Sequence, residues 1–119
     1  MSTRIAGVTI DCRDPHALAR FWSQLLGRPV TAEHSDDNWA SVGSVRDSTP
    51  RLTFQRVPEP NVGKVRLHLD IQVDDVSEAQ DRVLELGGSL TGERHDYDEG
   101  VVVVVRDPEG HEFCLVQFF

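Results

Sequence analysis

The chain carries the same set of helix signals twice, about 61 residues apart, and this internal repeat constrains its fold more than any other feature. Asp14 and Asp75 are each suited to cap a helix at its start, and Gly27 and Gly88 are each suited to end one. Two copies are too few for a solenoid. The repeat therefore predicts two similar modules in one pseudo-symmetric domain.

The first half predicts the order β-α-β-β-β. Residues 5–12 alternate as a strand does, and Asp14-Pro15 then starts a helix whose apolar stripe runs to Leu26. A loop is expected over residues 43–50. The remaining strands are predicted at residues 30–34, 38–42 and 51–57.

The second half repeats this order. Residues 65–73 alternate without a break, and a helix is expected over about 76–86. Asp107-Pro108-Glu109-Gly110 is a tight turn, and Val45-Arg46-Asp47 recurs at its start as Val105-Arg106-Asp107. Residues 95–100 are predicted to be an acidic turn, and the other strands lie at residues 89–94, 101–106 and 112–119.

The fold class that follows is α+β, as one domain over residues 1–119. The first module covers about 4–57 and the second about 64–119, with a Pro- and Gly-rich linker at 58–63. At 119 residues the chain has the size of one ordinary domain.

Composition excludes several classes of function. The net charge of −8 argues against a nucleic-acid partner, because phosphate binding needs a concentrated basic surface. No apolar run is long enough to span a bilayer, and the N-terminus has no signal-peptide core, so a cytoplasmic protein without a membrane partner is expected. Cys12 and Cys114 fit a reducing compartment.

Three motifs carry a resemblance to a known family. They are residues 8–15 (VTIDCRDP) leading into the helix, residues 66–71 (RLHLDI), and residues 106–113 (RDPEGHEF), where a DPxG turn precedes the last strand. Together they resemble the vicinal oxygen chelate superfamily, within it the small glyoxalase-like domain type of the glyoxalase, bleomycin-resistance and dioxygenase proteins. The resemblance implies that the two modules pair into an incomplete barrel with a concave cavity and the helices outside.

Active members of that superfamily hold a divalent metal in the cavity with His, Glu or Gln ligands. By the same resemblance, the ligand positions here are His68, Gly7, Cys114 and either Thr53 or Phe54. Only His68 and Cys114 could ligate, and at least three protein ligands are normal for a catalytic metal. No cofactor is therefore expected, with a divalent metal on His68 and Cys114 as the alternative.

Each candidate site residue has two interpretations, a purely structural role and a functional one. His68 is either a structural histidine, or a ligand-binding group or general base, because imidazole side chains in general can exchange a proton near neutral pH. Arg66 and Asp70 share its strand face, which is either a solvated surface or part of the cavity. Trp39 is either core or a flat wall for an aromatic ligand, and Cys114 is either a small buried apolar residue or a ligand contact.

The function expected from these observations is a small-molecule-binding protein of the glyoxalase/bleomycin-resistance type. It would bind a hydrophobic or aromatic ligand without metal, using Trp39, Arg66, His68, Asp70 and Cys114. The alternative is an enzyme: a metal-dependent lyase, isomerase or dioxygenase, or a metal-free isomerase or cyclase with His68 as acid and base. Related small members often dimerise, and the apolar end at residues 116–119 fits a homodimer surface.

Overall fold

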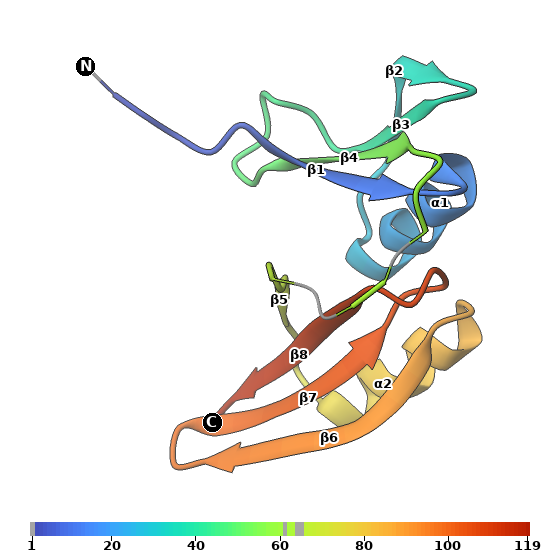
Figure 1. Cartoon of the computed structure of the whole chain (residues 1–119). Coiled ribbons are helices and arrows are strands. Elements are labelled where there is room, and N and C mark those ends of the chain that lie inside the picture. Colours follow the sequence, from blue (N-terminus) through green and yellow to red (C-terminus); the bar gives the residue numbers. More distant parts are fainter. Residues whose placement is uncertain (1, 61, 64–65) are drawn as a thin grey trace. The chain divides into compact units, whose positions relative to one another are not determined.

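The structure is a computed structural model of the chain and describes residues 2–60, 62–63 and 66–119, without the side chains of 32–35. The chain divides into two compact units, Met1–Pro60 and Asn61–Phe119, each with its own sheet and helix (Figure 1). No helix in the described part of the chain is long and apolar enough to cross a membrane.

The first unit contains one helix and a four-stranded mixed sheet with the strand order β1-β4-β3-β2. Strands β1 and β4 are parallel, and the other neighbours are antiparallel. The elements are β1 (Gly7–Cys12), α1 (Pro15–Leu26), β2 (Val30–Asp36), β3 (Trp39–Val42) and β4 (Arg51–Arg56).

Helix α1 begins and ends where its sequence predicts. The Asp14 carboxylate accepts a hydrogen bond from the backbone N–H of Ala17 at 3.1 Å, and Pro15 follows as the first helical residue. Gly27 ends the helix in the left-handed conformation at φ 65°. Its buried side chains form a core with those of the sheet: Leu18, Ala19, Phe21, Trp22, Ile10, Cys12, Ala40, Val42, Leu52 and Phe54.

The second unit has the same order of elements and the same strand order, β5-β8-β7-β6. The predicted α+β class and the β-α-β-β-β order are confirmed in each unit. The elements are β5 (Asp70–Gln72), α2 (Val76–Glu85), β6 (Ser89–Tyr97), β7 (Gly100–Arg106) and β8 (Glu112–Phe118).

Helix α2 is held at its start by two side chains, one of which comes from the sheet. Asp75 caps it by accepting from the N–H of Glu78, and Gln117 on β8 accepts from the N–H of Val76. At its end Gly87, the first residue of the Gly87-Gly88 pair that is predicted to stop the helix, has a positive φ, of 100°. Gly88 is required for a different reason, because a Cβ there would meet the Arg106 carbonyl oxygen at 2.5 Å.

The prediction of a strand over residues 65–73 is wrong in length. Strand β5 has only three residues, and Leu67 in the irregular segment before it is 65% exposed. The cause is the partner strand, because Asp70 pairs with Cys114 in parallel and β8 begins at Glu112. In this register Arg66 and Leu67 lie before the start of β8, so no residue of β8 is opposite them. Residues 64 and 65 lie outside the described residues.

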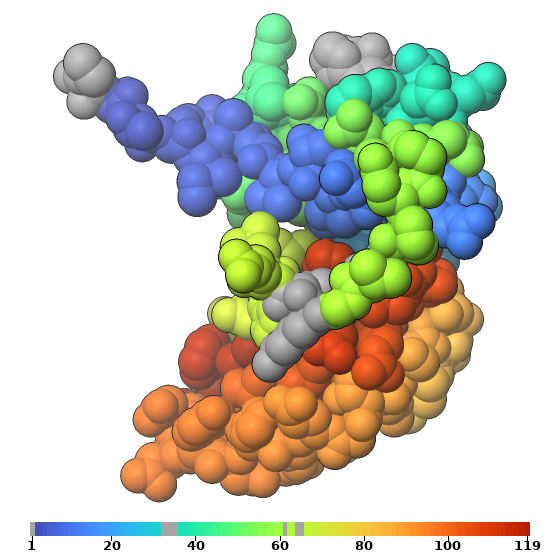
Figure 2. All heavy atoms as spheres, viewed as in Figure 1, coloured from blue at the N-terminus to red at the C-terminus, as the bar shows by residue number. Residues whose placement is uncertain are grey.

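The acidic turn predicted at residues 95–100 is also wrong in length. Strand β6 continues through His95 to Tyr97, and these residues pair with β7 up to Gly100, which leaves a two-residue turn. Asp98 and Glu99 form that turn, whereas Asp96 belongs to an exposed edge strand. The orange spheres of β6 in Figure 2 lie along the surface of the second unit. Charged side chains are a common way to protect such an edge from further pairing.

Candidate functional site

Each sheet has one face packed on the helix of its own unit, and we call the opposite one the helix-free face. On β4, Leu52 and Phe54 are buried on the helix side. Alternation then puts Arg51, Thr53 and Gln55 on the helix-free face. The same argument applies to every strand of the two sheets, so the strand registers define which side chains lie next to each other there.

Three rows of side chains cross the helix-free face of the first sheet. The first row pairs Gly7 with Arg51, and the second joins four hydroxyl residues across all four strands: Thr9, Thr53, Ser41 and Thr31. The third row contains Asp11, Gln55, Trp39 and Asp36. Trp39 is 38% exposed, so it lies outside the core of α1 and the sheet.

The register resolves which residue corresponds to Cys114. Thr9 pairs with Thr53 on β4, and 61 residues later Asp70 pairs with Cys114 on β8. Thr53, and not Phe54, therefore occupies the corresponding position. Its hydroxyl is 3.0 Å from that of Ser41, and both side chains are buried.

Two of the predicted site residues meet on the second sheet. Asp70 and Cys114 are register partners on the helix-free face, and Cys114 is 7% exposed. Burial raises the pKa of the Cys114 thiol, and the negative charge of Asp70 and a hydrogen bond with it raise the pKa further. The cysteine is therefore protonated at neutral pH, as a small buried residue would be.

The other two residues predicted on this strand are not part of the sheet. Arg66 and His68 are exposed and lie in the irregular segment that leads into β5. Trp39 belongs to the first unit, on β3. The structure thus brings together Asp70 and Cys114 and places the remaining three separately.

The residues at the family's metal positions do not fit a metal. A Cβ at Gly7 would lie 2.9 Å from the Arg51 carbonyl oxygen, so a ligating side chain could not be added there without a shift of the backbone. The Thr53 hydroxyl is hydrogen-bonded to that of Ser41, and the buried Cys114 stands where active members have a carboxylate ligand. The described residues contain no group of three or more His, Cys, Asp or Glu side chains that could hold a metal ion.

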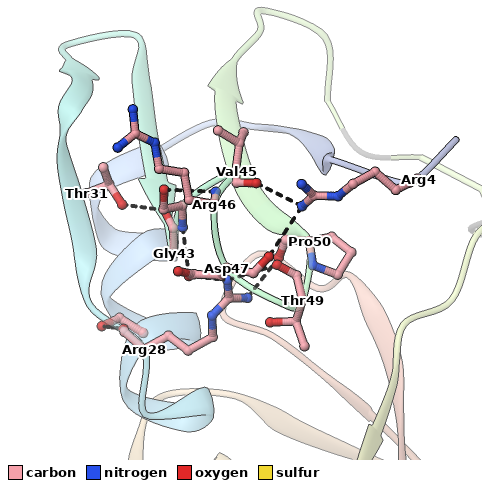
Figure 3. A network of polar contacts seen from close by, with 11 residues as sticks. Arg4, Arg28, Thr31, Gly43, Val45, Arg46, Asp47, Thr49 and Pro50 are labelled. Carbon is pink, nitrogen blue, oxygen red and sulfur yellow. Dashed lines mark hydrogen bonds and ion pairs between the residues drawn. The ribbon is translucent and has the colours of Figure 1, made fainter. Parts of the chain in front are cut away.

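A polar network in the loop after β3 has no counterpart in the predictions. The Arg28 guanidinium donates to the Pro50 carbonyl at 2.8 Å and to the Asp47 carboxylate at 3.0 Å, as Figure 3 shows. Asp47 also accepts from the N–H of Ser44 at 2.9 Å. That bond and the one with Arg28 hold the pKa of Asp47 below its ordinary value. The network fixes the loop that leads into Arg51.

Asp107 organises the corresponding turn of the second unit. Its buried carboxylate accepts from the N–H groups of Glu109 at 2.9 Å and His111 at 3.0 Å. The sequence indicates both turns, because the triplet that ends in Asp47 is repeated 60 residues later and ends there in Asp107. The two aspartates therefore position strands and are not ligand contacts.

A contact between two side chains on β6 was not predicted from the sequence. His95 Nε2 lies 2.7 Å from the Glu93 carboxylate, and the charge of Glu93 contributes to raising the pKa of Cys114. His95 was predicted to lie in a surface turn, so no pairing with the sheet was expected of it. The sequence could have indicated this contact only if β6 had been predicted to continue to Tyr97, which puts residues 93 and 95 on the same face of one strand.

The family follows from comparison of the whole chain. Residues 7–116 match the family model described as "Glyoxalase-like domain". The chain belongs to the glyoxalase-like domain family. Its fold is the vicinal oxygen chelate fold, which confirms the resemblance found in the three sequence motifs.

Solved structures of low sequence identity share this fold. A glyoxalase/bleomycin resistance protein/dioxygenase family enzyme from Burkholderia phytofirmans PsJN is 17% identical, with a TM-score of 0.78 over 98% of this chain and 100% of that one. The fosfomycin resistance protein FosX from Mesorhizobium loti is 16% identical, with a TM-score of 0.73 over 100% of this chain and 95% of that one.

A curated relative is "Glyoxalase 1" of Caenorhabditis elegans, 22% identical over 120 residues and 97% of this chain. The match spans 43% of the length of that relative.

Proposed function

We propose that this member of the family binds a small hydrophobic or aromatic molecule and does so without a resident metal. The platform is Trp39 on the helix-free face of the first sheet. Half-exposed tryptophan offers a large flat surface for a ring, and the neighbouring polar groups fix the orientation of a ligand. In the second unit, Asp70 on β5 and Arg66 and His68 in the segment before it are separate candidates for polar contacts with a ligand.

One observation carries the proposal: in the row that contains Trp39, the indole ring lies beside polar side chains that can form hydrogen bonds with a ligand. Gln55 is the register partner of Trp39, and Asp11 is the partner of Gln55. A core tryptophan would be surrounded by apolar side chains instead. A flat apolar surface beside an amide and a carboxylate is the composition of a small-molecule site.

The metal-free part of the proposal rests on the donor set. Gly7, Thr53 and a Cys114 thiol with a raised pKa stand where a metal-dependent member needs ligands, and His68 alone would remain. One or two protein ligands are too few for a catalytic metal centre. Acid–base chemistry at His68 is the alternative that does not need a metal.

Ligand binding is tested by substituting the platform. A library of aromatic compounds is screened against the unmodified protein by thermal shift. Each compound that binds is then titrated into the unmodified protein and into the Trp39→Leu variant. We expect at least about a tenfold loss of affinity, because stacking on the indole is removed. The matched control is Tyr97→Leu, an aromatic residue that is 54% exposed on β6. Equal loss in both variants, or none in Trp39→Leu, would contradict the proposal.

His68→Ala separates binding from catalysis. If His68 is an anchor, the variant loses ligand protection in the thermal shift in proportion to its lost affinity. If His68 is an acid–base group, the variant still binds the ligand but no longer converts it, which a product assay by mass spectrometry detects.

A further inference from the structure

One polar group at the start of β4 has no partner among the described residues. The Nε of Arg51 is buried, and no hydrogen-bond acceptor lies within reach of it in that part of the chain. Buried N–H groups are nearly always paired, because an unpaired one loses its hydration without compensation. An acceptor brought by a bound molecule would satisfy this donor.

Arg51 belongs to the same face as Trp39. It is the partner of Gly7 in the first row, and a Cβ built at Gly7 would lie 3.8 Å from the Cβ of Arg51, so the two positions share a side. Because Gly7 has no side chain, nothing from β1 covers the arginine in that row. Strand geometry puts the Arg51 and Gln55 rows about 13 Å apart at the backbone.

The row between them offers hydroxyl groups. Thr9 is exposed on β1 next to the buried Thr53. The face thus runs from a guanidinium, past hydroxyls, to an indole. Among the side chains that the structure describes on this face, the carboxylates of Asp11 and Asp36 lie at the far end, in the row of Trp39.

The charge distribution favours an anion on this unit. Residues 1–60 contain seven Lys and Arg and seven Asp and Glu, whereas residues 61–119 contain five and thirteen. The whole negative excess therefore belongs to the second unit. A negatively charged ligand group meets the least repulsion at the first unit, and Arg51 provides the charge that attracts it.

We infer that the ligand is an aromatic acid, with its ring on Trp39 and its carboxylate on the guanidinium of Arg51. The inference rests on the proposed function and names the class of molecule for it. A guanidinium binds a carboxylate through two parallel hydrogen bonds in one plane. Arg51 therefore supplies the positive charge for the carboxylate without a metal ion.

The test follows the Arg51 Nε–H itself by nitrogen-15 NMR. Labelled protein is titrated with 6-phenylhexanoate, whose chain lets the ring and the carboxylate approach both rows, and, separately, with 6-phenylhexanamide, a neutral compound of the same shape. We expect the acid to shift both the Arg51 Nε–H and the Trp39 indole N–H resonances. The amide should bind at least about tenfold more weakly than the acid, because it cannot form charge-assisted hydrogen bonds with the guanidinium.

Three variants complete the test. Arg51→Gln should reduce acid binding to the level of the amide, Arg51→Lys should restore part of it, and Arg20→Gln on the exposed side of α1 should change nothing. Equal binding of acid and amide in all variants would overturn the inference and leave small-molecule binding at Trp39 standing. No shift of the Trp39 resonance with either compound would overturn the inference, and the library screen on Trp39→Leu would then decide the proposed function separately.

Discussion

At the scale of single residues, hydrogen bonds and burial decide which candidates have a functional role. Asp47 and Asp107 lie in matching positions and bind the turns before the last strands. Trp39 and Arg51 lie on the helix-free face with exposed or unpartnered groups. Sequence alone could nominate Trp39, since it is a large aromatic in a hairpin. It could not nominate Arg51, because that depends on Gly7 being its register partner.

Asp47→Asn should lower the stability of the protein at neutral pH. The carboxylate accepts from the Ser44 N–H and from Arg28, and these bonds hold its pKa below the ordinary value of 3.8. A lowered folded-state pKa stabilises the protein above the unfolded-state pKa, and the effect is lost as the pH falls through the folded-state pKa. Urea unfolding should therefore show a difference between the variant and the unmodified protein at pH 7 that shrinks as the pH falls below 3.8.

The control for that prediction is Asp81→Asn on the exposed side of α2. It should change the unfolding midpoint little at either pH. A difference for Asp47→Asn that stays constant with pH would show that the carboxylate charge has no part in holding the loop.

Cys114 should be alkylated slowly, and Asp70→Asn should accelerate the reaction. The thiolate is the reactive form, and burial and the Asp70 charge raise the pKa of this thiol. Removing the charge lowers the pKa, so the rate at pH 8 rises. Mass spectrometry after timed iodoacetamide treatment measures it, with Asp74→Asn as the control. A rate unchanged by Asp70→Asn would argue that Asp70 does not act on the thiol.

At the scale of elements, local sequence signals predicted the helices and the tight turn correctly, but the lengths of two strands were not predicted correctly. Both helices start at their predicted caps, and the tight turn forms, with the Gly110 N–H donating to the Asp107 carbonyl at 2.9 Å. These features depend on a few neighbouring residues. The lengths of β5 and β6 were wrong because each is set by a partner strand far away in sequence. Alternation fixes the face of a side chain but not the extent of a ladder.

Gly88→Ala tests the packing of α2 on its sheet. A Cβ there would lie 2.5 Å from the Arg106 carbonyl oxygen and 2.6 Å from Val83 Cγ1, and Val83 is fully buried. We expect a loss of about 1–3 kcal/mol in the free energy of unfolding, as for other overpacked cores. Ser77→Ala on the exposed side of the same helix is the control. Equal stability of the two variants would mean that the helix can move away at no cost.

At the scale of the whole chain, the fold class was predictable and the assembly was not. The repeat of helix caps and the turn before the last strand were enough to predict the family, since both depend on local sequence. The residues that make up a binding face depend on strand register, which the sequence does not display. The homodimer expected from the apolar C-terminus remains a proposal.

We propose that Phe118 and Phe119 form a surface for a second copy of the chain. They are 58% and 80% exposed, and exposed aromatic residues next to each other favour contact with a partner. Light scattering after size exclusion should give twice the mass of the chain. The Phe118→Ser and Phe119→Ser double variant should give the monomer mass, and a monomer from both proteins would contradict the proposal.

We propose that the protein binds an organic ligand on the Trp39 face without a resident metal. The most direct measurement combines elemental analysis of protein purified without chelator with a titration of the best ligand before and after treatment with EDTA. We predict far less than one equivalent of metal and the same affinity in both titrations. About one equivalent of nickel, zinc, iron or manganese per chain, with affinity lost after EDTA, would contradict the account.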